Sequence, residues 1–313
     1  MPSNPTVSDL HVNGLLTNVG ISWMQDAAGF AAIECAPTVP VSKQSDLYNV
    51  FDQGDFWRDT MEVRADSTES AGDGYKVDTT GSYFAKVYSL HFDITEPMMA
   101  NADSIFSLEK TAVGLLMQKA MIRRDRLFAT NLFTTGKWTT DQTGVASSPT
   151  TNQFTKWSVS GSTPFADIEA QIENIHLRTG RKPNKMILGS SVWKALKTHA
   201  DTKDAVKYTQ IGIPTPALIA TMFDLEKVII ARGAYNSAAE GVTTVRAFNL
   251  SATDALLLYV PPAPSLTEPS GAYTFSWSGL TGSQNSGIRV KAFPIPEKGV
   301  IERVEVDMAL DIK

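Results

Sequence analysis

The sequence predicts a mixed α+β protein with long projecting segments around a smaller α/β unit. Three observations support this fold class. Apolar and polar residues alternate with the period of a β-strand over 60–66, 88–95 and 300–312. A helical period of threes and fours runs through 101–133. Between these regions, 164–260 alternates short helices with short apolar strands, which is typical of an α/β domain.

Composition limits the classes of protein to which the chain can belong. The 313 residues are 42% hydrophobic and 19% charged, which is normal for a folded globular protein. The single cysteine, Cys35, excludes an intrachain disulfide and a zinc site built from several thiolates, and it favours a reducing compartment. The net charge of −5 argues against a surface made for tight binding of nucleic acid.

Signals for secretion and for membrane insertion are not recognisable in the sequence. The first basic residue is Lys43, so the N-terminus lacks the positively charged start of a signal peptide. The longest apolar runs, 216–223 and 255–264, are well below the ~18–20 residues that a membrane-spanning helix needs. The sequence therefore predicts neither secretion nor a contact with a membrane.

Two extended segments are predicted in the N-terminal third. Residues 1–55 show no sustained period and are interpreted as an arm that lies over a neighbouring surface. Residues 60–66 are expected to pair with 75–95 in a long hairpin, because the polar stretch between them ends in Asp73-Gly74, a dipeptide favoured in tight turns. A two-stranded ribbon is marginal by itself in water, so this hairpin is expected to rest on another subunit.

The middle and C-terminal parts of the chain alternate between helix, loop and strand. A helix of about 45–50 Å is expected over 101–133, with Asn101 as its N-cap and Gly136 beyond its end. The stretch 134–164 is rich in Thr and Ser and is interpreted as an exposed loop. The remaining predicted elements are helices over 164–179, 190–200 and 214–223, and strands over 185–188, 227–231, 255–260, 288–293 and 300–312.

No arrangement of residues predicts catalysis or a cofactor. The four histidines lack metal-ligand spacing, and no Gly-x-Ser-x-Gly motif marks a nucleophile. Cys35 is interpreted as a small buried apolar residue. The prediction is therefore a protein without catalytic residues, metal or cofactor. An alternative is an α/β enzyme within 164–260 that uses His199, Asp201 or Asp204 as acid or base.

Several stretches, taken in order, resemble one known family. They are 40–48 followed by Phe56-Trp57-Arg58-Asp59 at the entry to the hairpin, then 123–133, then 187–189 with Trp193, and finally 273–277. Together with the long helix and the α/β unit, they resemble the major capsid proteins of tailed bacteriophages, whose shell-forming fold was first described for a lambdoid coliphage. The resemblance covers nearly the whole chain, although none of these stretches is a chemical signature.

The resemblance implies a division of the chain into five parts. Residues 1–55 would be the N-terminal arm, 56–96 the extended β-hairpin loop, 97–159 the spine helix and following loop of a peripheral domain, 160–285 an axial α/β domain, and 286–313 strands that return to the peripheral domain. In this family the axial domains meet at the centres of the capsomers.

The implied function is that of a coat protein. Such a protein assembles with copies of itself into hexamers and pentamers, forms an icosahedral head shell in the cytoplasm of the host bacterium, and encloses double-stranded DNA without sequence-specific binding. A portal protein and a separate scaffolding protein are the expected partners, and a decoration protein is an optional one. A nanocompartment shell of the encapsulin type, which holds a cargo enzyme, is the alternative within the same fold.

Assembly contacts are expected in the hairpin and in the basic part of the long helix. In that helix, three arginines enclose Asp125, a pattern that favours an ion pair between subunits or a contact with the helix dipole over nucleic-acid binding. The expected contact residues are Trp57, Arg58, Asp73, Gly74, Lys76, Arg123, Arg124 and Arg126.

Overall fold

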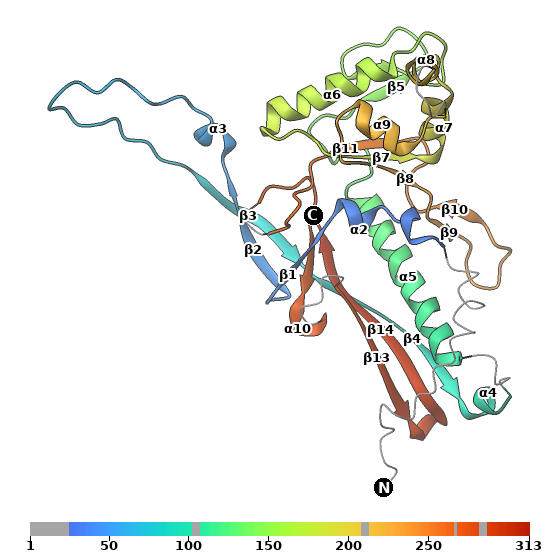
Figure 1. Cartoon of the computed structure of the whole chain (residues 1–313). Coiled ribbons are helices and arrows are strands. Elements are labelled where there is room, and N and C mark those ends of the chain that lie inside the picture. Colours follow the sequence, from blue (N-terminus) through green and yellow to red (C-terminus); the bar gives the residue numbers. More distant parts are fainter. Residues whose placement is uncertain (1–24, 102–106, 208–212, 266–267, 282–286) are drawn as a thin grey trace.

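The centre of the molecule is a mixed five-stranded sheet built around the last strand of the chain. The computed structural model describes residues 25–101, 107–207, 213–265, 268–281 and 287–313. Strand β14 (Val300–Ile312) pairs along one edge with β4 (Lys86–Thr95) and along the other edge with β13 (Ile288–Ile295) and β12 (Thr274–Trp277), all antiparallel. Strand β1 (Thr38–Val41) lies parallel to β12 and completes the sheet (Figure 1).

The long helix α5 (Leu108–Asn131) packs across one face of this sheet (Figure 1). Its buried residues include Ala112, Leu116 and Ala120, which follow one another at intervals of four residues and so lie next to one another on the helix surface. They meet the alternate apolar side chains of β14, which are Val304, Val306, Met308, Leu310 and Ile312. The helix and the sheet together enclose the main hydrophobic core.

Helix α5 begins later than its apolar period predicts. Ser107, and not Asn101, caps the helix, because the Ser107 side chain accepts a hydrogen bond from the Lys110 backbone N–H at 3.4 Å. Residues Glu96–Asn101 form a separate short helix, α4, and residues 102–106 lie outside the described part of the chain. With 24 residues, α5 is about 36 Å long, so the predicted length was an overestimate.

Part of the N-terminal segment belongs to the core, which differs from the loose arm predicted over 1–55. Residues Ala31, Ala32, Cys35 and Ala36 in and around helix α2 (Ala32–Cys35) are each 0% exposed and pack in the same core as α5. Small residues produce little apolar periodicity, so the sequence pattern does not reveal their burial. Residues 1–24 of the predicted arm lie outside the described part of the chain.

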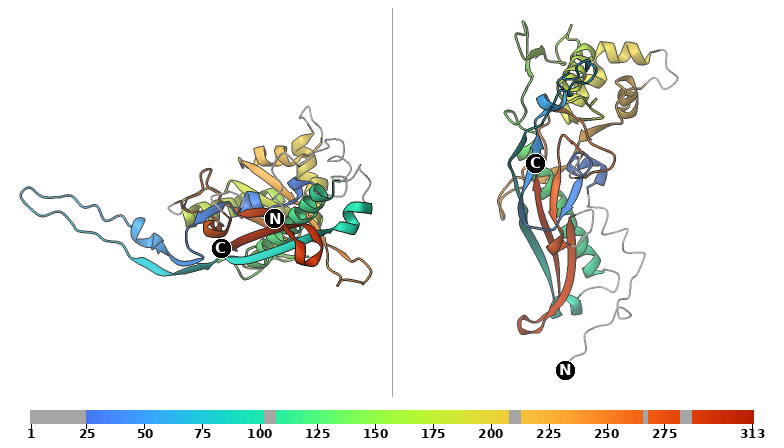
Figure 2. Two further views of the ribbon diagram at one scale, coloured as in Figure 1. Left: turned by 90° about the horizontal axis from the view of Figure 1, so that it is seen from below. Right: turned by 90° about the vertical axis from the view of Figure 1, so that its left-hand side faces the viewer.

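The predicted hairpin exists, but its first strand is a different one. Strand β3 (Val77–Phe84) pairs antiparallel with β2 (Ser45–Phe51) and not with residues 60–66, which form no strand. Beyond β3 the chain passes through Ala85 directly into β4, so the β2–β3 ribbon continues into the central sheet. The ribbon and the chain between its strands project far from the rest of the molecule (Figure 2).

A smaller α/β unit stands at one end of the central sheet (Figure 1). In its three-stranded sheet, β7 (Lys185–Gly189) lies between a parallel β8 (Lys227–Ala231) and an antiparallel β11 (Ala255–Leu258). Its second core includes Ile168, Met186, Leu188, Leu196 and Ile219. The helices of the unit are α6 (Pro164–Thr179), α7 (Ser190–Thr198), α8 (Ala200–Val206) and α9 (Pro216–Met222).

Most predicted elements of the α/β unit are confirmed, with one correction. Helix α6 has the predicted bounds and ends at Gly180, whose φ of +65° is left-handed. The predicted helix over 190–200 is two helices, because His199 has an extended backbone (φ −62°, ψ 148°) between α7 and α8. The predicted loop over 134–164 is confirmed apart from the first residue of α6 and one short parallel pair, β5 (Thr143–Val145) and β6 (Gln153–Thr155).

The remaining elements are short. They are η2 (Ala27–Gly29), α3 (Gln53–Phe56), β9 (Ala234–Asn236), β10 (Arg246–Phe248), α10 (Ser278–Thr281) and η3 (Pro296–Lys298). Within the described ranges, no helix combines the length and the apolar character needed to cross a membrane.

Candidate assembly surfaces

The segment that links β2 to β3 is exposed to solvent along nearly its whole length. We call residues 57–76 the outer loop; it contains turns but no helix or strand, and every residue from 61 to 80 is exposed. Met61 and Val63 are 95% and 101% exposed although both side chains are apolar. Long exposed loops that add nothing to their own core are usually functional, so the outer loop is a candidate contact surface for another molecule.

An aromatic cluster holds the base of the outer loop together. The rings of Phe51, Phe56 and Tyr75 lie in contact, with each pair of ring centroids 5.7 Å apart. Close by, the Asp55 carboxylate accepts a hydrogen bond from the Lys76 backbone N–H at 3.0 Å. These contacts join the two ends of the loop, so its base has a defined shape without help from another subunit.

Trp57 and Arg58, two of the predicted contact residues, lie at this base. A Cβ atom added at Gly180 would be 2.6 Å from the Trp57 ring, so the ring packs directly against the C-terminal end of α6. The Gln53 side chain also donates a hydrogen bond to the backbone carbonyl of Arg178 in α6. Trp57 remains 52% exposed, and Arg58 lies 3.4 Å from the Asp55 carboxylate with 62% of its side chain exposed.

Replacing Gly180 by alanine is expected to disturb this attachment. Gly180 has a φ of +65°, and the added methyl group would overlap the Trp57 ring. Gly299→Ala is the matched control, because Gly299 has a φ of +64° and nothing lies within 4 Å of its added Cβ. We expect the control to lower the free energy of unfolding by about 1 kcal/mol and Gly180→Ala by about 2 kcal/mol or more. Equal losses in urea unfolding would contradict the Trp57 contact.

The Asp73-Gly74 pair does not form the predicted hairpin turn. Gly74 lacks the positive φ that such a turn needs, and the chain reverses at 65–68, where Ser67 has a φ of +60°. The Thr60 hydroxyl donates a hydrogen bond to the Asp73 carboxylate at 2.5 Å, and the Gly74 backbone N–H donates a second. These two hydrogen bonds lower the pKa of Asp73. Asp73 and Gly74 therefore fold the outer loop on itself and stay exposed.

Arg124 is buried within the subunit, in contrast to the predicted contact between subunits. Its guanidinium donates hydrogen bonds to the Ala36 carbonyl at 3.1 Å, the Thr38 hydroxyl at 2.9 Å and the Thr274 hydroxyl at 3.4 Å. With 1% of the residue exposed, it joins α5 to the N-terminal segment and to β12. A charge-assisted hydrogen bond of this kind is stronger than a neutral one, so Arg124 is a structural residue.

The other two arginines of the predicted cluster also have partners within the chain. The Arg123 guanidinium lies over the Tyr88 ring at 4.9 Å from its centroid, and the Arg126 guanidinium lies over the Tyr235 ring at 4.2 Å. Arg126 also donates a hydrogen bond to the Tyr235 hydroxyl at 2.5 Å. The three arginines thus point to different neighbours and do not form one basic patch.

Sequence reasoning missed Asp125, which is 0% exposed beside Arg124. Its carboxylate accepts hydrogen bonds from the Ala32 backbone N–H at 2.9 Å and from the Asn249 amide at 3.3 Å. Burial raises the pKa of this carboxyl to about 6, although the hydrogen bonds oppose the shift. A usable signal was present: Arg124 lies four residues after Ala120 and four before Phe128, so a charged pair falls on the buried stripe of the helix.

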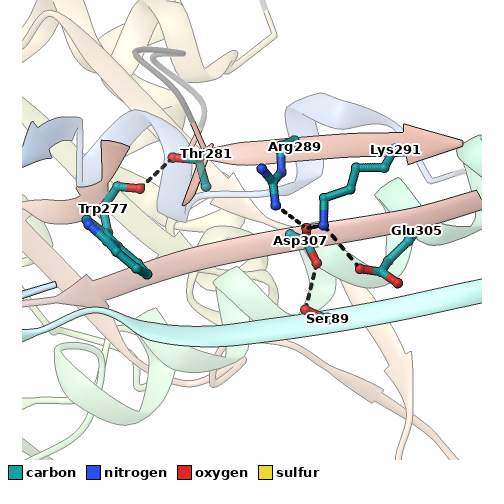
Figure 3. Close-up of polar contacts among 7 residues, drawn as sticks. All are labelled: Ser89, Trp277, Thr281, Arg289, Lys291, Glu305 and Asp307. Atoms are coloured by element: carbon teal, nitrogen blue, oxygen red, sulfur yellow. Dashed lines mark hydrogen bonds and ion pairs between the residues drawn. The ribbon is translucent and has the colours of Figure 1, made fainter. Parts of the chain in front are cut away.

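The face of the central sheet opposite α5 carries ion pairs between β13 and β14 and a hydrogen bond from β4 (Figure 3). Asp307 of β14 lies 2.6 Å from the Lys291 ammonium and 2.9 Å from the Arg289 guanidinium, both on β13. It also accepts a hydrogen bond at 2.7 Å from the Ser89 hydroxyl on β4, and Lys291 lies 3.4 Å from Glu305. Burial alone would raise the pKa of Asp307, but the hydrogen bonds from Lys291, Ser89 and Arg289 outweigh it and lower this pKa.

Ser162, His199 and Asp201 lie close together in the α/β unit, but the Ser162 hydroxyl does not donate its hydrogen bond to His199, as a catalytic serine would. His199 Nε2 lies 3.1 Å from the Ser162 hydroxyl, and Nδ1 lies 3.5 Å from the Asp201 carboxylate. However, Nδ1 accepts the Asp201 backbone N–H at 3.2 Å as the N-cap of α8, so the proton of a neutral ring is on Nε2. The Ser162 hydroxyl donates to the Val159 carbonyl instead. His199 is therefore placed as a helix cap and not as a base toward Ser162.

Other reactive or ligating groups are not organised into a site. Cys35 is buried, as predicted, and burial raises the pKa of its thiol to about 12. In the described part of the chain, no three His, Cys, Asp or Glu side chains are placed to hold a metal ion. A hollow of about 420 Å³ on the α/β unit is lined by Glu169, Ile172, Glu173, His176, Lys182, Met222, Phe223 and Asp224.

Comparisons with known sequences point to one class of protein. Residues 142–276 match a family model described as phage major capsid protein E. The chain is also 26% identical over 275 residues to the major capsid protein of Burkholderia phage BcepMu, an alignment that covers 86% of this chain and 84% of that protein.

Comparisons with solved structures agree with the fold class predicted from the sequence. A phage-related protein from Bordetella bronchiseptica RB50 has a TM-score of 0.66 and 19% identity, with 96% of this chain and 93% of that chain covered. The capsid of cyanophage P-SCSP1u has a TM-score of 0.56 and 10% identity, and the match covers 99% of this chain and 91% of that chain. The mature capsid of bacteriophage PhiM1 has a TM-score of 0.54 and 8% identity, and the match covers 100% of this chain and 88% of that chain. The predicted mixed α+β shell fold is confirmed.

Proposed function

This chain is a phage major capsid protein, which forms the head shell, and we propose that copies of it join through the β2–β3 ribbon and the outer loop. The observation that supports this route is that residues 61–80 are exposed while the base of the loop is fixed by Phe51, Phe56 and Tyr75. A ring of identical subunits needs two different surfaces on each copy that bind each other. A long projecting segment spreads such contacts over the neighbouring copies.

The proposal includes the arrangement of the subunit within hexamers and pentamers of an icosahedral shell. The α/β unit, within 160–285, would occupy the centre of each capsomer, and α5 with the central sheet would form its periphery. Two separate hydrophobic cores, one for each part, support this division. The N-terminal arm in this arrangement is shorter than the predicted range 1–55, because Ala31 and Cys35 are buried in the core of the peripheral part.

Further partners belong to the same proposal. Assembly in the cytoplasm of the host bacterium would require a portal protein and a separate scaffolding protein, with a decoration protein as an optional addition. The shell would enclose double-stranded DNA without sequence-specific binding, and the net charge of −5 supports a wall that does not trap the duplex. The subunit would carry out no catalysis, which the capping role of His199 supports.

The alternative, an encapsulin-type compartment, predicts different contents. A head shell packages DNA, whereas a compartment holds a cargo enzyme. The alignment with the Burkholderia phage major capsid protein, which is 26% identical and covers 86% of this chain, favours the head shell.

Electron microscopy of the protein co-expressed with its neighbouring genes tests the proposal, with light scattering to measure particle mass. Closed shells, tubes or rings of five and six subunits are the expected result. A uniform monomer in the presence of the neighbouring gene products would overturn the proposal, and shells filled with one enzyme and without DNA would favour the compartment.

Deletion of residues 67–74 is expected to weaken the shell and to spare the fold of the subunit. The side-chain hydrogen bonds of Thr68 and Asp73 are with residues of the outer loop itself, so the Tm of the unassembled subunit should stay within about 2 °C of its original value. The shells should dissociate at lower urea concentration, as followed by light scattering. Shells of unchanged stability would contradict the proposed role of the loop.

A further inference from the structure

The net negative charge of the chain is concentrated around the outer loop. The stretch 52–78 contains eight carboxylates and three basic side chains, a net charge of −5 that equals the net charge of the whole chain. The remaining residues are therefore neutral overall. Four carboxylates toward the outer end are exposed and form no ion pair with any residue of the described ranges: Asp59, Glu62, Asp66 and Glu69.

Helices α7 and α8 present basic side chains on their outer surface. Lys194, Lys197 and Lys203 are exposed, and none of them is paired with a carboxylate in the part of the chain that the structure describes. The apolar residues between them, such as Trp193 and Leu196, face the core of the α/β unit. The surrounding stretch 178–207 has eight basic side chains and two aspartates, a net charge of +6. We call Lys194, Lys197 and Lys203 the lysine face.

The outer loop and the lysine face lie on opposite sides of the subunit. The loop projects to the left in Figure 1, starting where Trp57 meets Gly180 at the end of α6, whereas α7 and α8 are at the right-hand end of the α/β unit. The outer loop therefore points away from the lysine face of its own subunit. Two complementary surfaces on opposite sides of one subunit are what a head-to-tail ring of copies requires.

We propose that the acidic outer loop of one subunit docks on the lysine face of the next subunit in the ring. This inference rests on the proposed function, because it assumes that copies assemble, and it adds the surface that receives the loop. Carboxylates and ammonium groups attract each other over about 8 Å at physiological salt, which orients the loop before close contact forms. Met61 and Val63, which are almost fully exposed in the subunit, then lose contact with water.

Charge reversal on both surfaces tests the contact. The loop variant is Glu62→Lys with Asp66→Lys, and the face variant is Lys194→Glu with Lys197→Glu. Either variant alone is expected to lower the yield of sedimenting shells about tenfold or more, because like charges then meet. The combination of both pairs is expected to restore the yield to within about threefold of the original protein, which misfolded subunits could not do.

A matched control changes the same charge elsewhere. Lys137 and Lys156 are also exposed and lie in the region 134–164, so Lys137→Glu with Lys156→Glu is expected to leave the yield of shells unchanged. Circular dichroism of the unassembled subunits shows whether each variant folds. The shell yield of the original protein is measured in parallel at physiological salt and at about 1 M salt, where the screening length falls to about 3 Å and a lower yield is expected.

The outcomes separate this inference from the proposed function. If the original protein forms shells and neither charge-reversed variant changes the yield, the docking inference is overturned and the proposed function stands. If the original protein forms no shells with its neighbouring gene products, both are overturned. If the face variant forms shells at the original yield but loses packaged DNA, the lysine face binds nucleic acid, and the docking inference is overturned.

Discussion

Replacing Asp125 by alanine is expected to lower the free energy of unfolding by about 3–5 kcal/mol, a large fraction of the stability of a typical domain. The carboxylate is the acceptor for two buried donors, the Ala32 backbone N–H and the Asn249 amide. Without it, both donors remain buried and lose their partner, which costs more than the hydrogen bonds contribute. Urea unfolding of the unassembled subunit, followed by circular dichroism, measures the loss.

Asp125→Asn is the control that separates hydrogen bonding from charge. Asparagine keeps an acceptor for the Ala32 N–H. The Asn249 Oδ1 atom is buried and has no hydrogen-bond partner within the described ranges, so a rotated Asn249 amide can accept a hydrogen bond from the new side chain. We therefore expect Asp125→Asn to fold. Alanine and asparagine variants of equal stability would contradict this role for Asp125.

The asparagine variant should also change the dependence of stability on pH. The pKa of Asp125 is about 6 in the folded subunit, above its ordinary value of 3.8, so the folded state holds a proton that the unfolded chain releases. The stability contributed by this group is therefore greatest below pH 3.8 and falls as the pH rises toward about 6. Asparagine does not titrate, so Asp125→Asn should lose this fall between pH 4 and 6, as measured by urea unfolding at several pH values.

Replacing Asp307 by alanine is the second change with a large expected effect, about 3 kcal/mol at pH 7. Its side chain is 3% exposed and lies between the cationic groups of Lys291 and Arg289. Removal of the carboxylate leaves these two positive charges close together, and the Ser89 hydroxyl loses its acceptor. Because the three partners come from β13 and β4, the loss should appear as unfolding of the whole central sheet in urea.

The effect of Asp307 should depend on pH with the opposite sign to that of Asp125. The pKa of Asp307 is lowered in the folded subunit, so its contribution is fully present above the ordinary value of 3.8 and is lost as the pH falls further. Asp307→Asn keeps the shape of the side chain and removes the titration. The difference in stability between the original protein and this variant should therefore shrink by about 1 kcal/mol from pH 7 to pH 3. An unchanged difference would contradict the ion pairs of Figure 3.

Elements with a strong local pattern could be predicted closely from the sequence. Strand β14 has the predicted bounds because apolar residues occupy every second position from Val304 to Ile312, and all of these residues are buried. Helix α6 has the predicted bounds because a proline begins it and Gly180 ends it. In both cases the information lies within the element itself.

The partner of β3 could not be predicted, because the choice depends on contacts far away in the sequence. Residues 60–66 alternate as a strand does, but they include no aromatic side chain. In the ribbon, Tyr48 of β2 and Tyr83 of β3 both stack on Phe275 of β12, with ring centroids 5.7 Å and 4.8 Å away. These stacked rings favour β2 over the nearer segment, and nothing local indicates that Phe275 will be present.

The exposure of the predicted contact residues agrees with the sequence-based prediction for some of them and not for others. The prediction placed contacts in the segment after β2, and Trp57, Arg58 and Lys76 do lie at the base of the exposed outer loop. Arg124 was predicted as an assembly contact because it belongs to the basic cluster around Asp125 in the long helix. Its burial depends on acceptors at Ala36 and Thr274, which only the folded chain brings to α5.

The continuity of β3 with β4 has a mechanical consequence. Tension on the outer loop passes lengthwise into β4, whose hydrogen bonds with β14 extend from the Lys86–Leu310 pair to the Thr95–Val300 pair. Antiparallel hydrogen bonds run perpendicular to the strands, so a lengthwise load is in shear and is shared by all of them at once. Peeling would break the same bonds one after another at much lower force. The sheet therefore resists a pull on the outer loop in the direction in which it is strongest.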